Sequence, residues 1–329
     1  MVSTLLKYSR LASETRQPDA TPTISRLDSL AAVPEEAIWL AKLKSARTRL
    51  AYRRDVQDFM NFVEISTPAE LRRVDHRAVI AWESHMRETQ RLQPTTIRRR
   101  LAALSSLFSH LVQHSVVISN PVRDVQRPRV SRRQGRTLAL SQRQARLVLD
   151  APSPNTVQGL RDRAILAVGF QVGLRRAEIT SLKVRDLHQN RGFDSLWINR
   201  KGAKRESVAI HPQVAQRIRD YLVAAGHQWQ LDGPMFRPLR GNGSSRCPLR
   251  TLHPDAVNRI LKKHILGICQ NSGYSAHSMR ATFITTALDN GANLEDVQRD
   301  VGHSDPATTK LYDRRGHNPE KSASFFANY

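Results

Sequence analysis

Cysteine is nearly absent from this chain, which has only two among its 329 residues. Cys247 and Cys269 are too few for a disulfide framework and do not have the spacing of a metal motif. No run approaches the ~18–20 apolar residues of a membrane span. The first ten residues, MVSTLLKYSR, lack the apolar stretch of a signal peptide. We therefore expect a cytoplasmic protein with reduced thiols, and no membrane contact.

Acidic residues are also scarce, with 29 Asp and Glu against 52 Lys and Arg, a formal net charge of +23 and a sequence pI near 11.1. This scarcity argues against a metal-dependent nuclease, because such an enzyme needs clustered carboxylates to hold its ions. The basic residues occur in both halves of the chain, and Arg exceeds Lys. Because neutralised phosphates release counterions, and Arg suits bidentate phosphate contacts, nucleic acid is favoured over a membrane surface as the partner.

The length and the 40% content of apolar residues allow two domains with cores of their own. Polar, proline-punctuated residues at the start indicate a flexible arm, and an arginine-rich stretch with two prolines and a glycine indicates a linker. The predicted organisation is an arm (1–34), a small helical domain (35–122), a basic linker (123–137), a second domain (138–316) and a C-terminal tail (317–329).

Helical periodicity dominates the first predicted domain. Asp75 is a plausible N-cap, and Pro94 suits the first turn of the clearest helix. Apolar stripes run along two helices at helical spacing, formed by Tyr52, Val56, Phe59 and Val63 and by Ile97, Leu101, Leu104, Phe108 and Leu111. A basic triplet near the start of the second helix is equally consistent with a solvated face and with a phosphate-facing surface. The DNA-binding candidates are this triplet and two linker arginines: Arg98, Arg99, Arg100, Arg132 and Arg133.

The second predicted domain is mainly helical and contains one small antiparallel β-sheet. Ser141 is a candidate N-cap, and Gly173 suits a left-handed position at the end of a largely buried helix. The runs DSLWINR and ESVAI, separated by KGAK, predict a β-hairpin. The pair Asp305-Pro306 is typical of the start of a short helix. The fold class is therefore mainly α with a small antiparallel β-sheet, in two domains.

Several residue types in this domain are suited to phosphate chemistry. His277 and Arg280 are three residues apart on a helix capped by Ser275, so their side chains share one face near a helix N-terminus, which favours anions. Arg175 follows Gly173-Leu174, and Glu178 is placed either to orient its guanidinium or to form a surface pair.

Four other residues carry weak signals when taken alone. Lys201 and Lys204 lie in the predicted hairpin turn, where lysines usually serve solubility. His303 follows Gly302 and so lies in a connection, and Tyr312 comes one short helix later. A lone tyrosine near a C-terminus supports no catalytic role.

Taken together, the local sequences GLRRAEI, KGAKRE, HSMR and VGHSDPATTKLY resemble the tyrosine recombinases, or phage integrases, and in particular their compact Xer-like members. The resemblance extends from about residue 36 to about residue 315. It includes a first-domain helix marked by Thr48, Tyr52, Asp55 and Phe59. It implies a helical SAM-like core-binding domain followed by a recombinase catalytic domain. It also implies six catalytic positions, on which Arg175, Lys201, His277, Arg280, His303 and Tyr312 fall. One departure is Ala281, where members often have a second histidine.

The resemblance implies a mechanism that agrees with the residue chemistry. Tyr312 is expected to attack a phosphodiester and form a 3′-phosphotyrosine. An unperturbed phenol has a pKa near ~10, so it needs a base, for which His277 is our candidate. Arg175, Arg280 and His303 are expected to stabilise the transition state. Lys201 is expected to protonate the 5′-oxygen that leaves. No cofactor is expected, neither ATP nor a divalent metal.

Two alternatives remain open on the sequence: a type IB topoisomerase, which shares the tyrosine chemistry, and a catalytically silent DNA-binding protein. The family implies a homotetramer on two duplexes with inverted-repeat half-sites. We hypothesise that the C-terminal tail, which contains Phe325, Phe326 and Tyr329, inserts into a neighbouring subunit. The target sequence, the need for accessory proteins, and the choice among integration, excision, resolution and inversion cannot be read from the residues.

Overall fold

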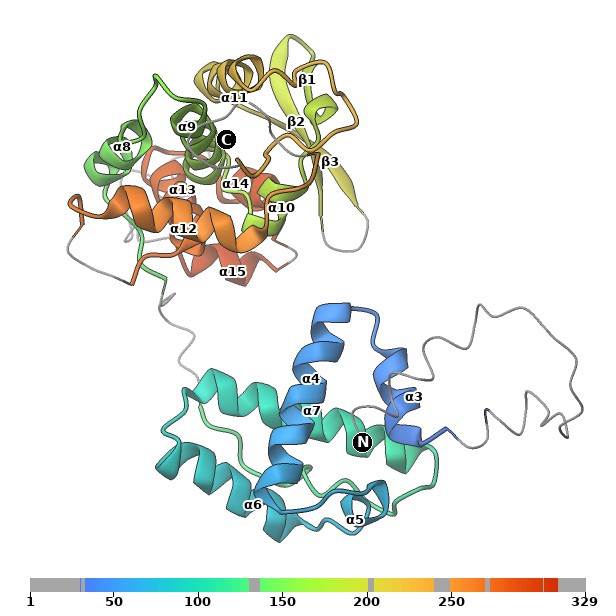
Figure 1. The fold of residues 1–329 in the computed structure, drawn as a ribbon. Helices are drawn as coiled ribbons and strands as arrows, with labels where there is room; N and C mark the ends of the chain where they lie inside the picture. Colours follow the sequence, from blue (N-terminus) through green and yellow to red (C-terminus); the bar gives the residue numbers. More distant parts are fainter. Residues whose placement is uncertain are drawn as a thin grey trace, which may run out of the picture. The chain divides into compact units, whose positions relative to one another are not determined.

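The structure, a computed structural model, describes residues 30, 33–129, 137–200, 204–239, 249–269, 273–303 and 305–312. The chain divides between Ser131 and Arg132 into two compact units (Figure 1), each of which is considered by itself. Both are helical, and the second also contains a three-stranded antiparallel sheet, which confirms the predicted fold class. The predicted C-terminal tail and nearly all of the predicted arm lie outside the described residues.

In the described residues of the first unit, the regular secondary structure is all helical. Its elements are α3 (Glu35–Lys42), α4 (Ala46–Phe62), α5 (Pro68–Leu71), α6 (His76–Ser84), the π-helical turn η1 (His85–Thr89) and α7 (Pro94–Gln113). Asp75 caps α6 by accepting hydrogen bonds from the backbone N–H groups of Arg77 and Ala78, as predicted. Pro94 is the first residue of α7. A backbone N–H at this position has no partner within the helix, so a proline there loses no hydrogen bond.

The core of this unit is formed by the predicted apolar stripes of α4 and α7 together with α6. Phe59 and Trp82 are fully buried and meet edge to face, with ring centroids 5.0 Å apart. All five apolar residues predicted on the α7 stripe are buried. Val125, which lies inside the predicted linker, packs into the same core. The linker residues Arg132 and Arg133 lie outside the described part of the chain.

The second unit contains the helices that were expected to carry the site, together with the sheet. Its elements are α8 (Gln142–Asp150), α9 (Val157–Gln171), α10 (Arg176–Ser181), the short 3-10 helix η2 (Val184–Asp186), β1 (Leu187–Asn190), β2 (Phe193–Asn199), β3 (Arg205–Ala209), α11 (Pro212–Ala224), α12 (Pro254–Ile265), α13 (Ala276–Asp289), α14 (Leu294–Val301) and α15 (Pro306–Lys310). The buried helix α9 packs against α11 on one side and α13 on another.

The sheet has the order β1-β2-β3, with both pairs antiparallel. Leu196 of β2 is opposite Val208 of β3, and both side chains are buried. The predicted hairpin is therefore present, and β1 adds a strand that the sequence pattern did not indicate. Its residues, LHQN, are short and lack the alternation of polar and apolar residues on which strand prediction depends.

Local signals placed several helix ends correctly. Ser141 caps α8, and Asp305 caps α15 by accepting a hydrogen bond from the Ala307 N–H at 2.9 Å. Gly173 and Gly302 have φ of 69° and 63°, the left-handed region in which glycine is favoured. In the part of the chain that is described, no helix is both long enough and apolar enough to cross a membrane.

Candidate active site

Arg175 immediately precedes α10, and a carboxylate on the same helix orients it. Glu178 is buried and accepts hydrogen bonds from the Arg175 backbone N–H at 2.8 Å and from Nη1 at 2.7 Å. The other end of the guanidinium donates from Nη2 to the Gly302 carbonyl at 3.2 Å. The side chain nevertheless stays 40% exposed. Of the two readings of Glu178, orientation of the guanidinium fits these contacts, and a surface pair does not.

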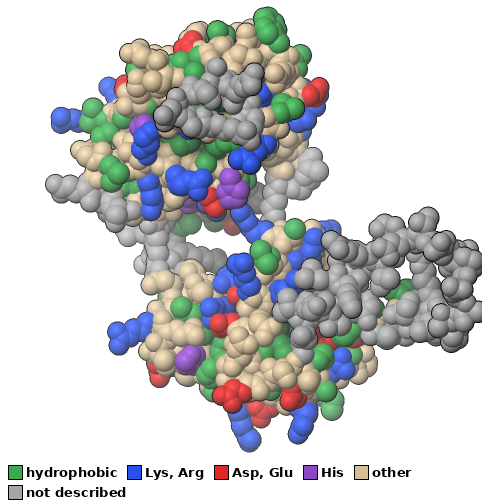
Figure 2. Space-filling view, in the orientation of Figure 1, with side chains coloured by type: hydrophobic (Ala, Val, Ile, Leu, Met, Phe, Trp, Pro, Cys, Tyr) green, Lys and Arg blue, Asp and Glu red, His purple; other side chains and the backbone are tan. Residues whose placement is uncertain are grey.

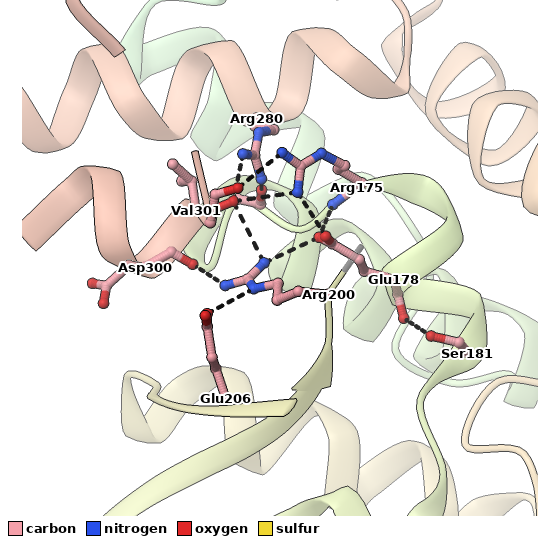
Figure 3. Close-up of polar contacts among 10 residues, drawn as sticks. Arg175, Glu178, Ser181, Arg200, Glu206, Arg280, Asp300 and Val301 are labelled. Carbon is pink, nitrogen blue, oxygen red and sulfur yellow. Dashed lines mark hydrogen bonds and ion pairs between the residues drawn. The ribbon is translucent and has the colours of Figure 1, made fainter. Parts of the chain in front are cut away.

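Arg280, from α13, lies beside Arg175 and is almost completely buried, with 1% of its surface exposed (Figure 3). Its Nη1 donates to the Gly173 carbonyl at 2.8 Å, and its Nη2 donates to the Val301 carbonyl at 2.5 Å. Burial, and next the nearby charge of Arg175, lower the pKa of Arg280 to about 9, which leaves it charged at neutral pH. Nε is buried and has no partner among the described residues, so these residues leave one donor of this cation unsatisfied.

Tyr312 and His277 meet although 35 residues separate them in the sequence. The Tyr312 hydroxyl lies 3.2 Å from His277 Nε2, within hydrogen-bonding distance. Burial, followed by the charges of Arg280 and Arg175, lowers the pKa of His277. A lowered pKa favours the neutral imidazole, and when the proton of that imidazole is on Nδ1, Nε2 accepts the proton of the phenol. The tyrosine ring packs against the small apolar cluster formed by Ile284, Leu288, Val297 and Val301.

His303 leaves α14 directly after Gly302, whose left-handed conformation ends that helix. Its backbone N–H donates to the Gln298 carbonyl at 3.1 Å. Its Nδ1 lies 2.9 Å from Thr309 Oγ1; when that hydroxyl donates, Nε2 carries the proton and is a donor. Burial, and then the charges of Arg280 and Arg175, lower the pKa of His303 to about 4. His303 is thus a neutral hydrogen-bond donor at physiological pH.

The structure therefore brings together five of the six predicted positions around the ends of α9, α13 and α14: Arg175, His277, Arg280, His303 and Tyr312. Lys201 lies outside the described residues. Sequence reasoning missed Arg200, the last residue before it, which is buried and donates from Nη1 to Glu178 at 3.2 Å. The only sequence signal was its position next to Lys201, and that signal did not distinguish it from other basic residues.

In the first unit, the predicted DNA-binding arginines of α7 are largely engaged with other groups. Arg99 pairs with the buried carboxylate of Asp55, and Arg100 pairs with Asp58. Arg98 donates to the Pro128 carbonyl at 3.1 Å and has no ion pair among the described residues. Lys and Arg side chains are spread over the visible face of both units in Figure 2.

One group among the described residues has the composition of a metal site, Glu35, His110 and His114 in the first unit. His110 Nε2 is 2.9 Å from Glu35 Oε2, and Nδ1 is 3.3 Å from the Lys42 ammonium. Both imidazole nitrogens are thus already hydrogen-bonded, and a cation is adjacent. We interpret the group as a polar link between α3 and α7.

Comparison with known sequences gives a consistent result over both units. Residues 139–318 match the model of the Phage integrase family, and residues 35–115 match that of the Phage integrase N-terminal SAM-like domain. The tyrosine recombinase XerC of Pelobacter propionicus is 32% identical over 270 residues, which cover 82% of this chain and 84% of the relative. The tyrosine recombinase XerD of Listeria monocytogenes is 29% identical, with 82% of this chain and 88% of the relative covered.

Solved structures show the same fold at low sequence identity. XerH site-specific recombinase bound to its difH substrate, in a pre-cleavage complex, aligns with a TM-score of 0.61 at 16% identity, covering 99% of this chain and 94% of that one. A lambda integrase tetramer bound to a Holliday junction aligns with a TM-score of 0.64 at 11% identity, covering 93% and 87%.

Proposed function

Because the chain belongs to the phage integrase family of tyrosine recombinases, we propose that it cuts and rejoins duplex DNA through a covalent bond to Tyr312. A site-specific DNA recombinase activity is supported by this membership. The observation that carries the residue assignment is the contact of 3.2 Å between the Tyr312 hydroxyl and His277 Nε2, next to two guanidinium groups.

The first step follows from this geometry. The Tyr312 oxygen attacks phosphorus while its proton passes to the neutral His277 Nε2. Arg175 and Arg280 hold the non-bridging oxygens, and His303 donates a further hydrogen bond as charge develops on them. The bond from phosphorus to the 5′-oxygen breaks, and we assign Lys201 to protonate that oxygen. The products are a 3′-phosphotyrosine and a 5′-hydroxyl.

Rejoining needs no energy input, because the phosphotyrosine keeps the energy of the phosphodiester. A 5′-hydroxyl from another strand attacks it, and the same groups act in reverse. We therefore propose that the reaction requires neither ATP nor a divalent metal. Extensive similarity to XerC and XerD recombinases favours strand exchange over topoisomerase-type relaxation and over a silent DNA-binding role.

Exchange between two duplexes breaks four strands and so requires four tyrosines. We propose a homotetramer on paired DNA sites with inverted-repeat half-sites. The lambda integrase tetramer on a Holliday junction supports this proposal. The proposal does not specify whether accessory proteins take part. We also propose that the protein acts in the cytoplasm. We keep the predicted insertion of the tail into a neighbouring subunit as a hypothesis, and unchanged assembly after deletion of residues 319–329 would contradict it.

The test is a suicide substrate, a nicked duplex with candidate sites, incubated in EDTA with the wild-type protein or Tyr312→Phe. The expected result is a denaturation-resistant protein–DNA adduct with the wild type only, while both proteins bind DNA alike. An adduct that persists in Tyr312→Phe would contradict the assignment of the nucleophile. Loss of the wild-type adduct in EDTA, with recovery in Mg²⁺, would contradict the metal-free mechanism.

A further inference from the structure

Arg200 directly follows β2 and lies at the centre of the polar network in Figure 3, although it is not among the predicted catalytic residues. Its side chain is only 5% exposed. Nε donates to Glu206 of β3 at 3.1 Å, and Nη1 donates to Glu178 of α10 at 3.2 Å. Nη2 donates to the Asp300 carbonyl in the last turn of α14. Because each of its three nitrogens already donates to an oxygen, Arg200 is not placed to bind a phosphate directly.

The end of α14 explains why an arginine is buried at this point. The last four carbonyls of an α-helix have no donor within the helix. Two backbone N–H groups that follow α14 satisfy the carbonyls of residues 298 and 299. The remaining two, of Asp300 and Val301, accept hydrogen bonds from the buried side chains of Arg200 and Arg280. Cations are also favoured there, because the C-terminal end of a helix carries partial negative charge.

The guanidinium of Arg175 depends on groups that Arg200 also contacts. Arg175 Nη1 donates to Glu178 at 2.7 Å and lies 3.4 Å from the Val301 carbonyl, and Nη2 donates to the Gly302 carbonyl at 3.2 Å. Arg200 Nη1 lies 3.2 Å from Glu178 and 3.5 Å from the Val301 carbonyl. Since the Arg175 side chain is 40% exposed, these polar contacts, and not enclosure by the core, set its direction.

The third partner of Arg175, Gly302, is held by close packing. A Cβ on Gly302 would lie 2.9 Å from Arg200 Nε and 3.0 Å from its Cδ, closer than ordinary contacts allow. Gly302 thus serves two needs, the left-handed φ that ends α14 and the close approach of Arg200. The packing of Arg200 therefore also sets the position of the carbonyl to which Arg175 Nη2 donates.

Arg280 has more support of its own. It is 1% exposed, and its Nη1 donates to the Gly173 carbonyl at 2.8 Å, at the end of a different helix. A buried guanidinium with a second anchor is expected to keep its place when Arg200 is removed. The dependence on Arg200 should therefore be concentrated in Arg175.

We propose that Arg200 is a positioning residue for Arg175: it holds the Glu178 carboxylate and the end of α14, and thereby sets where the Arg175 guanidinium meets a non-bridging oxygen of the phosphate. This inference rests on the proposed function, in which Arg175 holds that oxygen. A residue that acts only through Arg175 has nothing left to position once Arg175 is gone. A residue that supports the fold in general lowers the rate by the same factor whether Arg175 is present or not.

The experiment is a double-mutant cycle on single-turnover adduct formation with the nicked suicide substrate. It compares wild type, Arg175→Met, Arg200→Met and the double variant, at saturating protein and at a temperature at which all four are folded. Arg175→Met alone should lose about 10²–10³ in rate. Arg200→Met alone should lose about 10–100-fold, a loss typical of small misplacements. Adding Arg200→Met to Arg175→Met should cost no more than about a further threefold, close to the usual error of additivity.

Two further variants separate positioning from general stability. Arg161→Met removes another buried arginine of the same unit, one that pairs with Asp162 and donates to the Arg237 carbonyl. It should lower the melting temperature, and any loss of rate should be the same with and without Arg175→Met. Arg200→Lys keeps the charge but not the planar fork. It should show a smaller loss that again depends on Arg175, and it replaces Arg200→Met in the cycle if that variant does not fold.

The proposal is overturned if Arg200→Met forms the adduct at the wild-type rate. It is also overturned if the loss from Arg200→Met is as large on top of Arg175→Met as it is alone. A wild-type rate for Arg175→Met would overturn this inference and the role of Arg175, while the tyrosine chemistry would stand. No adduct from the wild type would contradict the proposed function as a whole, and this inference with it.

Discussion

Arginines gather in two places in this protein, at the end of α14 in the second unit and along the first turns of α7 in the first. On α7, Arg99 and Arg100 each have a carboxylate of their own, Asp55 and Asp58. At α14, the guanidinium groups share Glu178 and Glu206 and otherwise donate to backbone carbonyls. The Arg99 and Arg100 pairs are each neutral, whereas the three guanidinium groups at α14 share two carboxylates, and two of the three, Arg200 and Arg280, are buried.

This difference shows that arginine content by itself does not locate a phosphate site. Burial of an uncompensated cation costs free energy, and a fold keeps it only where an anion or a polar network compensates. The α14 group has such a network, and it still leaves the Arg280 Nε without a partner among the described residues. We therefore expect substitutions at α14 to affect catalysis and those on α7 to affect mainly affinity.

The largest effect should follow Arg175→Met. Removing one donor from a site that stabilises developing negative charge typically costs about 10²–10³ in rate. Adduct formation on a suicide substrate should fall by that factor, with little change in DNA affinity. Arg99→Met on α7 is the matched control and should leave the single-turnover rate unchanged. Equal losses of rate in the two variants would remove the distinction between the two groups.

The next prediction concerns the free energy of unfolding, which should differ between Glu178→Gln and Asp55→Asn. Glu178→Gln leaves the guanidinium groups of Arg175 and Arg200 without their carboxylate, and breaking a buried pair such as Arg200–Glu178 costs about 3 kcal/mol. Asp55→Asn should be nearly neutral, because burial raises the pKa of Asp55, so its charged form is already disfavoured. Urea unfolding, monitored with one probe in the second unit and another in the first, measures the two changes in the free energy of unfolding.

Added orthophosphate tests whether the α14 group binds anions. It should restore part of the stability of Glu178→Gln and change that of Asp55→Asn little, because the vacated position faces two guanidinium groups in the first variant and only the half-exposed Arg99 in the second. The same stabilisation by phosphate in both variants would indicate nonspecific anion binding.

A smaller effect is expected from pH. The folded pKa of His303 is about 4, below the ordinary 6.5, so the unfolded chain binds a proton first as the pH falls. His303 therefore contributes stability above pH ~6.5 that is lost progressively toward pH ~4, on the order of 1 kcal/mol for a half-buried group. The difference in melting temperature between wild type and His303→Asn should change across this window.

The sequence patterns predicted correctly those features that depend on residues close together in the chain. Caps such as Asp75 and Asp305 were predicted correctly because their partners are two or three residues away. The apolar stripes on α4 and α7 were found for the same reason. Arg200 was missed because the acceptors that bury it, Glu178 and Asp300, are 22 and 100 residues away. The ion pairs of Arg99 and Arg100 were equally invisible, since their carboxylates lie more than 40 residues earlier.

The smallest effect should come from Arg98, the member of the α7 triplet that donates to a backbone carbonyl instead of a carboxylate. If its charge neutralises one DNA phosphate, Arg98→Gln should reduce the slope of log K against log salt by about 0.9. The ratio of wild-type to variant affinity would then change by only about threefold over a fourfold change in salt, with cleavage at saturating protein unaffected. Arg100→Gln is the matched control, and its slope should change less, because removing Arg100 also releases the negative charge of Asp58 near the DNA. A larger change for Arg100 than for Arg98 would mean that DNA displaces the carboxylate, and the α7 pairs would then be an unbound state of a phosphate-binding surface.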